Sequence, residues 1–445
     1  MKKGLFAFTA LAFTVVLSYG AERYKDRMFD VKVENDVVYA KDVLHLNTLS
    51  SLSTAMTQLV GAGRSVSLYD SETEMSPIDL HMDVYTPKDD SESKRPVVLV
   101  MHGGAFAAGS KDDMEQQSVT YCDSLAARGF VAIAVQYRLG ITATLENKVL
   151  TIDSLNFSRT VYRGIQDVRA AVRYVRSKAS DLGIDKDRVY LLGNSAGAIL
   201  ALENIYMDKP SEVPAVAHDA PDLGELDNYG VQDVSAQANA AVALWGAVHD
   251  PAIIGETDSP VLLVHGTADS TVLFKTGRPL GNLASTLGVN AMMLRLAGIN
   301  SININTPTLY GSFVVDSVLK AKNVEHETYF VDDMPHEFYD EDDYDVKVRE
   351  KVFTFLYDLT QKPSTSKVVA VAMARPAQVH MGEGNMNFTV ASGTNLPYAV
   401  MDLRGRTVMS GRVSQGEVVG LDALERGVYV LRVKGERPLR FGLAK

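Results

Sequence analysis

Residues 189–198 read VYLLGNSAGA, and this pattern gives the strongest indication of the fold. Its first half is an apolar run of strand length, and residues 196–207 show a helical pattern of apolar positions. Gly193 and Gly197 carry no side chains at the places where a sharp turn brings a strand and a helix together. The stretch therefore predicts a strand, a tight turn with Ser195 at its tip, and a helix.

Similar apolar runs recur along the chain. The others are residues 97–101, 131–135, 241–245, 261–264 and 328–331. Their Val and Leu residues mostly do not alternate with polar ones, which is typical of parallel strands buried on both faces. Helical patterns cover residues 167–176 and 346–359. Strands and helices in alternation predict an α/β fold with a mostly parallel central sheet.

Two segments before these runs have a different pattern. Residues 65–69 and 79–85 alternate between apolar and polar positions, which predicts antiparallel strands. Residues 42–64 fit neither pattern throughout, and we interpret them as an insertion that is helical in part.

The chain has 445 residues and a net charge of −11, which is unevenly distributed. Residues 21–362 contain 31 Lys and Arg and 49 Asp and Glu, whereas residues 363–445 contain 11 and 6. The net charge therefore changes from −18 to +5 at a polar stretch. We predict a large domain over residues 21–362, a linker over residues 363–379 and a small domain over residues 380–445. An acidic large domain disfavours binding to nucleic acids and to anionic membranes.

The small domain has short segments separated by turns. They are residues 386–390, 398–403, 407–410, 427–434 and 439–443. Their alternation predicts a small antiparallel β-sandwich.

The N-terminal residues have the features of a signal peptide. Two lysines precede a mostly apolar run over residues 5–17, and Ser18 and Gly20 are small residues at the usual positions before a cleavage site. The run is short for a membrane span, although a membrane anchor is the alternative. We predict a signal peptide over residues 1–20, with no membrane span in the mature chain. The single cysteine, Cys122, excludes an intrachain disulfide and a cysteine-rich zinc site.

Ser195 is the first candidate for catalysis. A serine hydroxyl is a weak nucleophile near neutral pH, so it needs a base beside it and donors for the negative charge that develops. The predicted turn presents the side chain of Ser195, and the following helix directs the positive end of its dipole toward that charge. The alternative is a surface Gly-Ser turn without chemistry.

A second glycine turn, His102-Gly103-Gly104, follows the run at residues 97–101. Glycines allow backbone N–H groups to approach a substrate oxygen closely, so Gly103 and Gly104 are candidates for an oxyanion hole. A glycine turn with no part in catalysis is the alternative. We interpret His102 as a brace for this loop and not as a base.

Asp269 and His336 complete the candidate site. Asp269 follows a buried run, and His336 lies in the loop after the last run. The order of Ser195, Asp269 and His336 along the chain is the one expected for α/β hydrolases.

Neighbouring titratable residues offer alternatives for these roles. Asp332 and Asp333 precede His336 in its own loop and compete for the role of the acid. We interpret His265 as structural, and His326, which lies just before its strand, as a weaker candidate for the base.

Together these motifs resemble the α/β-hydrolase carboxylesterases, in the esterase and lipase branch with a His-Gly-Gly loop. The matching motifs are residues 102–104, 166–176, 193–197, 245–247, 265–269 and 336, and they span most of residues 80–358. The resemblance implies an α/β-hydrolase fold with Ser195 as nucleophile, His336 as base and Asp269 as acid.

The resemblance also implies an oxyanion hole in which the backbone N–H of Ala196 acts with those of Gly103 and Gly104. Many relatives have a third glycine where this chain has Ala105. This difference leaves open which amides of the turn point into the hole.

Residues 401–406 and 421–430 resemble parts of the C-terminal sorting domain of type IX secretion systems. The resemblance implies that residues 380–445 are recognised by the secretion machinery, which exports the chain through the periplasm of a Gram-negative-type bacterium to the exterior or the cell surface. A carbohydrate-binding β-sandwich is the alternative. It is disfavoured because the only tryptophan, Trp245, lies outside the small domain.

We therefore expect a secreted serine carboxylesterase without cofactor or metal. The expected substrate is a small-molecule or polysaccharide ester, and resemblance to acetyl-xylan and feruloyl esterases favours acetyl or feruloyl esters of plant cell walls. A general short-chain carboxylesterase or lipase is the close alternative, and a non-catalytic surface protein with a hydrolase fold is the distant one. Residues 140–163, 208–236 and 280–312 are expected to set specificity. The acidic residues 337–343 lack an ordered calcium-ligand pattern and are interpreted as a solvated loop.

Overall fold

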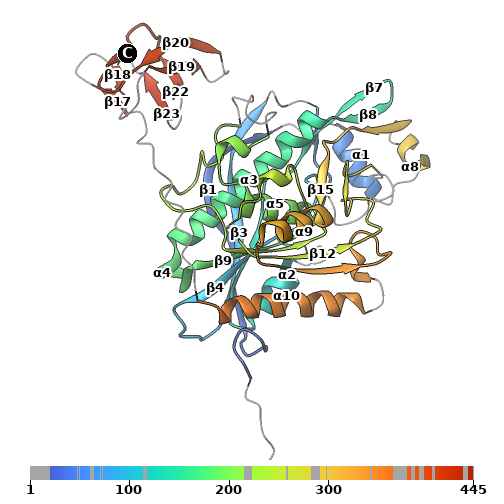
Figure 1. Ribbon diagram of the computed structural model, residues 1–445. Helices are drawn as coiled ribbons and strands as arrows, with labels where there is room; N and C mark the ends of the chain where they lie inside the picture. Colours follow the sequence, from blue (N-terminus) through green and yellow to red (C-terminus); the bar gives the residue numbers. More distant parts are fainter. Residues whose placement is uncertain are drawn as a thin grey trace, which may run out of the picture.

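The central element of the structure is an eight-stranded sheet in the order β1-β3-β5-β4-β9-β10-β12-β16 (Figure 1). Its strands are β1 Val31–Leu46, β3 Met75–Pro87, β4 Arg95–Met101, β5 Val131–Val135, β9 Ile184–Asn194, β10 Ala240–Leu244, β12 Val261–Gly266 and β16 His326–Val331. Strand β3 is antiparallel to both of its neighbours, and every other pair in this sheet is parallel. The sheet is mostly parallel, as the sequence predicts.

The computed structural model describes most of the chain. The described residues are 21–47, 49, 51–60, 65–70, 72, 74–113, 118–214, 223–256, 259–281, 291–296, 298–340, 343–363, 378–381, 386–389, 395–402, 406–433 and 439–443. The expected signal peptide, residues 1–20, lies outside them. No helix within the described ranges combines the length and the apolar composition that crossing a bilayer requires.

The two faces of the sheet contribute to two separate hydrophobic cores. In β4, Val97, Leu99 and Met101 belong to one core, and Val98 and Val100 belong to the other. All five side chains are buried. Successive side chains of a strand point to opposite faces, so the uninterrupted apolar run reflects coverage of both faces.

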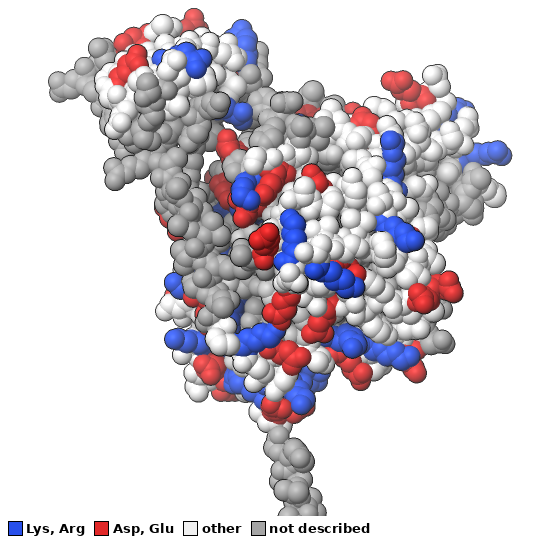
Figure 2. Space-filling view, in the orientation of Figure 1, with Lys and Arg blue, Asp and Glu red and all other residues white. Residues whose placement is uncertain are grey.

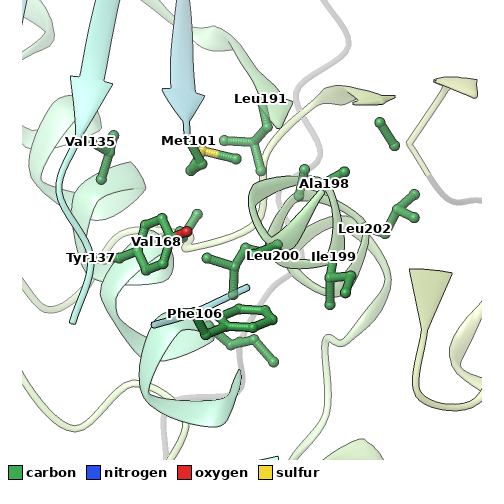
Figure 3. Packing of buried hydrophobic residues seen from close by; sticks show 14 of the residues in the cluster. Met101, Phe106, Val135, Tyr137, Val168, Leu191, Ala198, Ile199, Leu200 and Leu202 are labelled. Carbon is green, nitrogen blue, oxygen red and sulfur yellow. The ribbon is translucent and has the colours of Figure 1, made fainter. Parts of the chain in front are cut away.

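Helices cover both faces (Figure 1). They are α2 Ser118–Ala126, α3 Ser154–Ser177, α5 Ala196–Tyr206, α9 Ser312–Lys322 and α10 Tyr344–Gln361. Residues of α3, α5 and α9 lie in the first core, and residues of α2 and α10 lie in the second. Figure 3 shows part of the first core, in which Ala198 of α5 lies near Leu191 of β9. Helix α3 begins before the predicted residues 167–176, because Asp153 caps it by accepting a hydrogen bond from the N–H of Asn156 at 2.8 Å.

Several expectations at the edge of the fold need correction. Strand β16 is not buried on both faces, because it lies at the edge of the sheet and pairs only with β12. Residues 65–69 do not form an antiparallel strand, since only Leu68–Tyr69 (β2) is extended, and it pairs in parallel with Ile141–Thr142 (β6). The supposed insertion, residues 42–64, is only partly an insertion. Its first residues continue β1, which the sequence pattern did not predict, whereas the expectation of a helical part is confirmed by helix α1, Ser51–Val60.

Short elements make up the connections between these strands and helices. They are β7 Thr144–Glu146, β8 Val149–Ile152, α4 Ala179–Leu182, η1 Pro210–Glu212, β11 Ala247–Val248, η2 Pro251–Ile253, β13 Thr276–Gly277, α8 Ala291–Leu296, β14 Ser301–Ile304, β15 Leu309–Gly311 and η3 Phe338–Asp340.

The C-terminal residues form two small antiparallel sheets with a core of their own. The strands are β17 Gln378–Met381, β18 Met386–Thr389, β19 Leu396–Asp402, β20 Thr407–Val413, β21 Val419–Gly420, β22 Gly427–Val433 and β23 Leu439–Leu443. One sheet has the order β17-β18-β21 and the other β20-β19-β22-β23. Phe388, Val400 and Leu431 are fully buried in a core that is separate from the two cores of the large sheet.

The surface carries both signs of charge. On the face shown in Figure 2, acidic and basic side chains are interspersed and are most frequent in the lower part, where Figure 1 places α10. The excess of acidic residues in the large domain is therefore not gathered into one acidic patch on this face.

Candidate active site

Ser195 occupies the strained turn between β9 and α5. Its φ of 53° and ψ of −113° are unusual for a residue with a side chain, and such strain costs on the order of 1–3 kcal/mol. Both flanking glycines are required sterically. A Cβ on Gly193 would lie 2.0 Å from the carbonyl oxygen of Gly197, and a Cβ on Gly197 would lie 2.3 Å from that of Met101. The strand, turn and helix predicted from residues 189–198 are all present.

The turn places Ser195 within reach of His336 and Asp269. Nε2 of His336 lies 2.9 Å from Oγ of Ser195, and Nδ1 of His336 lies 2.7 Å from Oδ2 of Asp269. A carboxylate can only accept, so Nδ1 carries a proton and Nε2 is free to accept the hydroxyl proton of Ser195. The structure thus brings the three predicted residues together in one hydrogen-bonded chain.

Burial and hydrogen bonding act in opposite directions on the pKa values of Asp269 and His336. Burial raises the pKa of Asp269, but hydrogen bonds from His265 and His336 outweigh burial and lower this pKa to about 2. Burial also lowers the pKa of His336, yet the hydrogen bond to Asp269 and the charges of Asp269 and Glu337 raise it above its usual value. Asp269 is therefore an anion at neutral pH, and it stabilises a positive charge on His336.

The competing acids and base lie elsewhere. Asp332 and Asp333 are both exposed, and the backbone N–H of Asp333 donates to Oγ1 of Thr267 at 3.0 Å. His326 lies at the start of β16, where its Nε2 is 3.1 Å from Oδ1 of Asp316. Of the three candidate acids, Asp269 is the one that accepts a hydrogen bond from His336.

The turn after β4 is held in an unusual conformation. Gly104 has a φ of +103°, and a Cβ there would lie 2.2 Å from the carbonyl oxygen of Ala108. Ala105 adopts a φ of 55°. The backbone is therefore left-handed at Ala105 although this residue carries a methyl group.

His102 braces this turn, as the sequence suggested. It is fully buried and stacks on Tyr137, with the ring centroids 4.4 Å apart. Its Nδ1 donates to the carbonyl oxygen of Gly103 at 2.7 Å, and the hydroxyl of Tyr137 donates to the carbonyl oxygen of His102 at 2.8 Å. In a trans peptide the N–H points opposite to the C=O, so fixing the Gly103 carbonyl also fixes the direction of the Gly104 N–H. Tyr137 is a contributor that the sequence pattern did not indicate.

The start of α5 lies beside this turn. The close approach of Gly197 to the carbonyl oxygens of Met101 and His102 joins the two segments. Ala196 is the first residue of α5, so its N–H has no partner within the helix. The predicted donors Gly103, Gly104 and Ala196 thus come from two segments that lie together at Ser195.

Trp245 is a further member of the site whose role the sequence did not reveal. It follows β10, is fully buried, and donates from Nε1 to the side-chain oxygen of Asn194. Its ring lies edge-on to His336, with centroids 6.2 Å apart. Trp245 therefore connects the residue before Ser195 with the imidazole.

An apolar cavity of about 30 Å³ lies against the glycine turn. Its lining consists of Met56, Val66, Leu68, Gly104, Ala105, Ala107, Ala108, Ile141, Leu150, Ile152, Leu280 and Ile302. None of these residues has a polar side chain, so a polar group placed there would lose its hydrogen bonds to water. The lining draws on two of the segments expected to set specificity, residues 140–163 and 280–312, and includes no residue of the third, residues 208–236.

The described residues contain no group of three or more His, Cys, Asp or Glu side chains arranged to hold a metal ion. Two residues of the acidic run at 337–343, residues 341 and 342, lie outside the described part of the chain.

Comparison with known proteins links the chain to esterases. The family described as BD-FAE matches residues 82–235, which include the glycine turn and Ser195 but neither Asp269 nor His336. Fumonisin B1 esterase of Sphingopyxis macrogoltabida is 30% identical over 174 residues, which are 36% of this chain and 31% of that protein. Para-nitrobenzyl esterase of Bacillus subtilis (strain 168) is 33% identical over 122 residues, 27% of this chain and 23% of that protein. The chain thus spans a third or less of the length of these curated relatives.

Among solved structures, the native form of an esterase from the Planctomycetes species Thermogutta terrifontis matches with 22% identity and a TM-score of 0.40, covering 65% of this chain and 91% of that one. The similarity to the curated relatives links the chain, over part of its length, to carboxylic ester hydrolases.

Proposed function

We propose that this chain is a serine carboxylesterase that works through an acyl-enzyme. The observation that carries the proposal is the continuous hydrogen-bonded chain from Ser195 through His336 to Asp269, which starts at a strained turn. Backbone strain at a serine is retained where the surrounding structure enforces it, and it is concentrated at functional sites. The similarity to esterases supports the same reaction class.

In the proposed mechanism, His336 removes the proton of Ser195 as Oγ attacks the ester carbonyl carbon. The N–H groups of Gly104 and Ala196, with that of Gly103, stabilise the resulting oxyanion. His336 then gives its proton to the leaving alcohol, and an acyl-enzyme remains. Water activated by His336 releases the acid and restores Ser195. Asp269 holds the imidazole in its tautomer and stabilises the positive charge in both steps.

For the substrate, we propose an acetyl or other short aliphatic ester of a plant cell-wall polysaccharide. The apolar cavity supports an aliphatic acyl group, because a short alkyl chain needs no hydrogen bonds there. It gives less support to a feruloyl group, whose phenolic and methoxy oxygens would lie against apolar side chains. A general short-chain carboxylesterase or lipase is the second candidate, and the same apolar lining favours it.

We also propose that the enzyme is secreted or held at the cell surface of a Gram-negative-type bacterium. The signal-peptide pattern of residues 1–20 supports export, and the sorting-domain motifs of residues 380–445 support recognition by type IX secretion machinery. The separate core of the C-terminal sheets is consistent with a detachable or independently recognised domain.

The test of the activity is hydrolysis by the purified full chain of nitrophenyl esters, acetylated xylan and methyl ferulate. Ser195→Ala should reduce the rate by about 10⁶-fold and abolish labelling by a fluorophosphonate. Ser317→Ala is the matched control, because this exposed serine of α9 makes a local hydrogen bond, donating to the carbonyl oxygen of Phe313 at 2.8 Å. Equal labelling of the wild type and Ser195→Ala would refute the nucleophile, and no hydrolysis of any ester by the wild type would support the non-catalytic alternative.

A further inference from the structure

His265 contacts the same carboxylate oxygen as His336. Its Nε2 lies 3.0 Å from Oδ2 of Asp269 and 2.9 Å from the carbonyl oxygen of Val272. Both partners are acceptors, so Nε2 carries a proton whatever the charge of the ring. Nδ1 lies 2.7 Å from Oγ of Ser312, and the side chains of His265 and Asp269 are completely buried.

Within the described part of the chain, Asp269 accepts hydrogen bonds at both carboxylate oxygens. Its Oδ1 accepts from the backbone N–H groups of Thr271 at 2.8 Å and Val272 at 3.0 Å. Its Oδ2 accepts from the two imidazoles. The backbone bonds fix one oxygen, so the carboxylate stays in place while the two histidines share the charge on the other oxygen.

We propose that His265 is a positioning residue that directs Oδ2 of Asp269 toward His336 and limits how strongly this carboxylate raises the basicity of His336. The inference rests on the proposed function, because the basicity of His336 matters only if this residue transfers protons. A carboxylate oxygen that accepts two hydrogen bonds disperses its negative charge over both donors, so each donor is held less strongly. His265 thus keeps His336 unprotonated at a lower pH than Asp269 alone would allow.

Few titratable side chains of the described residues contact His336 or Asp269. Among the described residues, the titratable side chains in contact with His336 are Asp269 and Glu337, the latter with Oε1 at 4.0 Å from Nε2. The titratable side chains in contact with Asp269 are His336 and His265. A substitution of His265 therefore affects the basicity of His336 through the carboxylate of Asp269.

The test compares two amide variants of His265 in the full chain. His265→Gln places an N–H donor near the position of Nε2, whereas His265→Asn reaches only the position of Nδ1 beside Ser312. The pKa of His336 is measured from its ring-proton resonances in a Ser195→Ala background, and kcat/KM is measured against pH with Ser195 present. We expect the His336 pKa and the acid limb of kcat/KM to move upward by about half a pH unit in His265→Asn and to stay in place in His265→Gln.

An unchanged or lowered midpoint in His265→Asn would overturn the proposal, even if its melting temperature falls, because a purely structural role would reduce stability without raising the midpoint. Ser312→Ala, which frees Nδ1, should shift the midpoint in the same direction, and it replaces His265→Asn if that variant does not fold. The resonance titration needs no activity. Absence of ester hydrolysis by the wild type would therefore refute the proposed function without deciding this test.

Discussion

Nε2 of His336 lies 2.9 Å from Oγ of Ser195, although 141 positions separate the two residues in the chain. Ser195 follows β9 and His336 follows β16, two strands that point the same way in the sheet. The carboxyl ends of parallel strands meet at one edge, so loops that are distant in sequence come together there. A proton can therefore pass between the two side chains along a single hydrogen bond.

The assignment of Asp269 as the acid is tested by amide substitution. Asp269→Asn should lower kcat by about 10⁴-fold, because the imidazole loses its tautomer and the stabilisation of its charge. Asp333→Asn removes an exposed carboxylate from the loop of His336 and should leave kcat unchanged. Steady-state kinetics with a nitrophenyl ester measures both, and the reverse ranking would reassign the acid to the loop.

The rate should depend on pH through His336. Only the unprotonated imidazole can take the Ser195 proton, and the pKa of His336 is raised above its usual value of about 6.5. Activity should therefore be full at higher pH and fall about tenfold per unit as the pH drops below a midpoint above about 6.5. Asp269→Asn should move the midpoint of its residual activity downward, because the hydrogen bond and charge that raise the pKa are lost. A midpoint well below 6.5 in the wild type would contradict the contact with an ionised Asp269.

The glycine turn should be sensitive to a single methyl group. Gly104→Ala introduces a Cβ 2.2 Å from the carbonyl oxygen of Ala108, so the turn must shift and its N–H groups lose their alignment. We expect kcat to fall by about 10²–10³-fold, the effect of losing one oxyanion donor. Gly298→Ala is the control, since Gly298 has a similarly positive φ of +79° but open space around its Cβ position. An equal loss of kcat in Gly104→Ala and Gly298→Ala would mean that a side chain at a glycine with positive φ is enough to lower kcat. The loss could then not be attributed to the glycine turn.

The cavity should determine acyl-chain preference. Ile302→Ala removes part of the lining on β14 and so enlarges the cavity. The substitution should favour longer acyl chains, so that the ratio of kcat/KM between an ester and the next shorter one rises about tenfold. Ile304→Ala is the matched control, because Ile304 lies two residues along the same strand but is not part of the lining. A series of nitrophenyl esters from acetate to octanoate measures the preference. Identical profiles for both variants and the wild type would show that the acyl group binds elsewhere.

The large domain should function without the C-terminal sheets. Helix α10 ends at Gln361, and Arg188 donates to the carbonyl oxygens of Thr360 and Lys362, which fixes the chain at this point. A chain ending at residue 363 should keep its esterase rate and melt within about 4 °C of the full chain, a change of about 1 kcal/mol or less. It should also fail to reach the exterior or cell surface of its native host. Insolubility or a lost rate would mean that the small domain stabilises the site, and unchanged export would remove support for the sorting role.

Local patterns in the sequence were enough to predict those parts of the fold that depend on burial and on turn geometry. The buried run at residues 131–135 became β5, and the glycines around Ser195 became a strained turn, because burial on two faces and a steric need for glycine both leave direct marks in the sequence. The order of Ser195, Asp269 and His336 also indicated the site before any distance was known.

Tertiary structure alone decided which distant groups meet. It brought Asp269, and not Asp333, into hydrogen-bond contact with His336. It also brought His265 to the same carboxylate and the hydroxyl of Tyr137 to the glycine turn. It also revealed β1, whose long edge strand carries mostly exposed or half-buried residues and so has no continuous apolar run. Such contacts depend on how strands and helices pack across the whole sheet. The types of two residues do not by themselves indicate how far apart the residues lie in the folded chain.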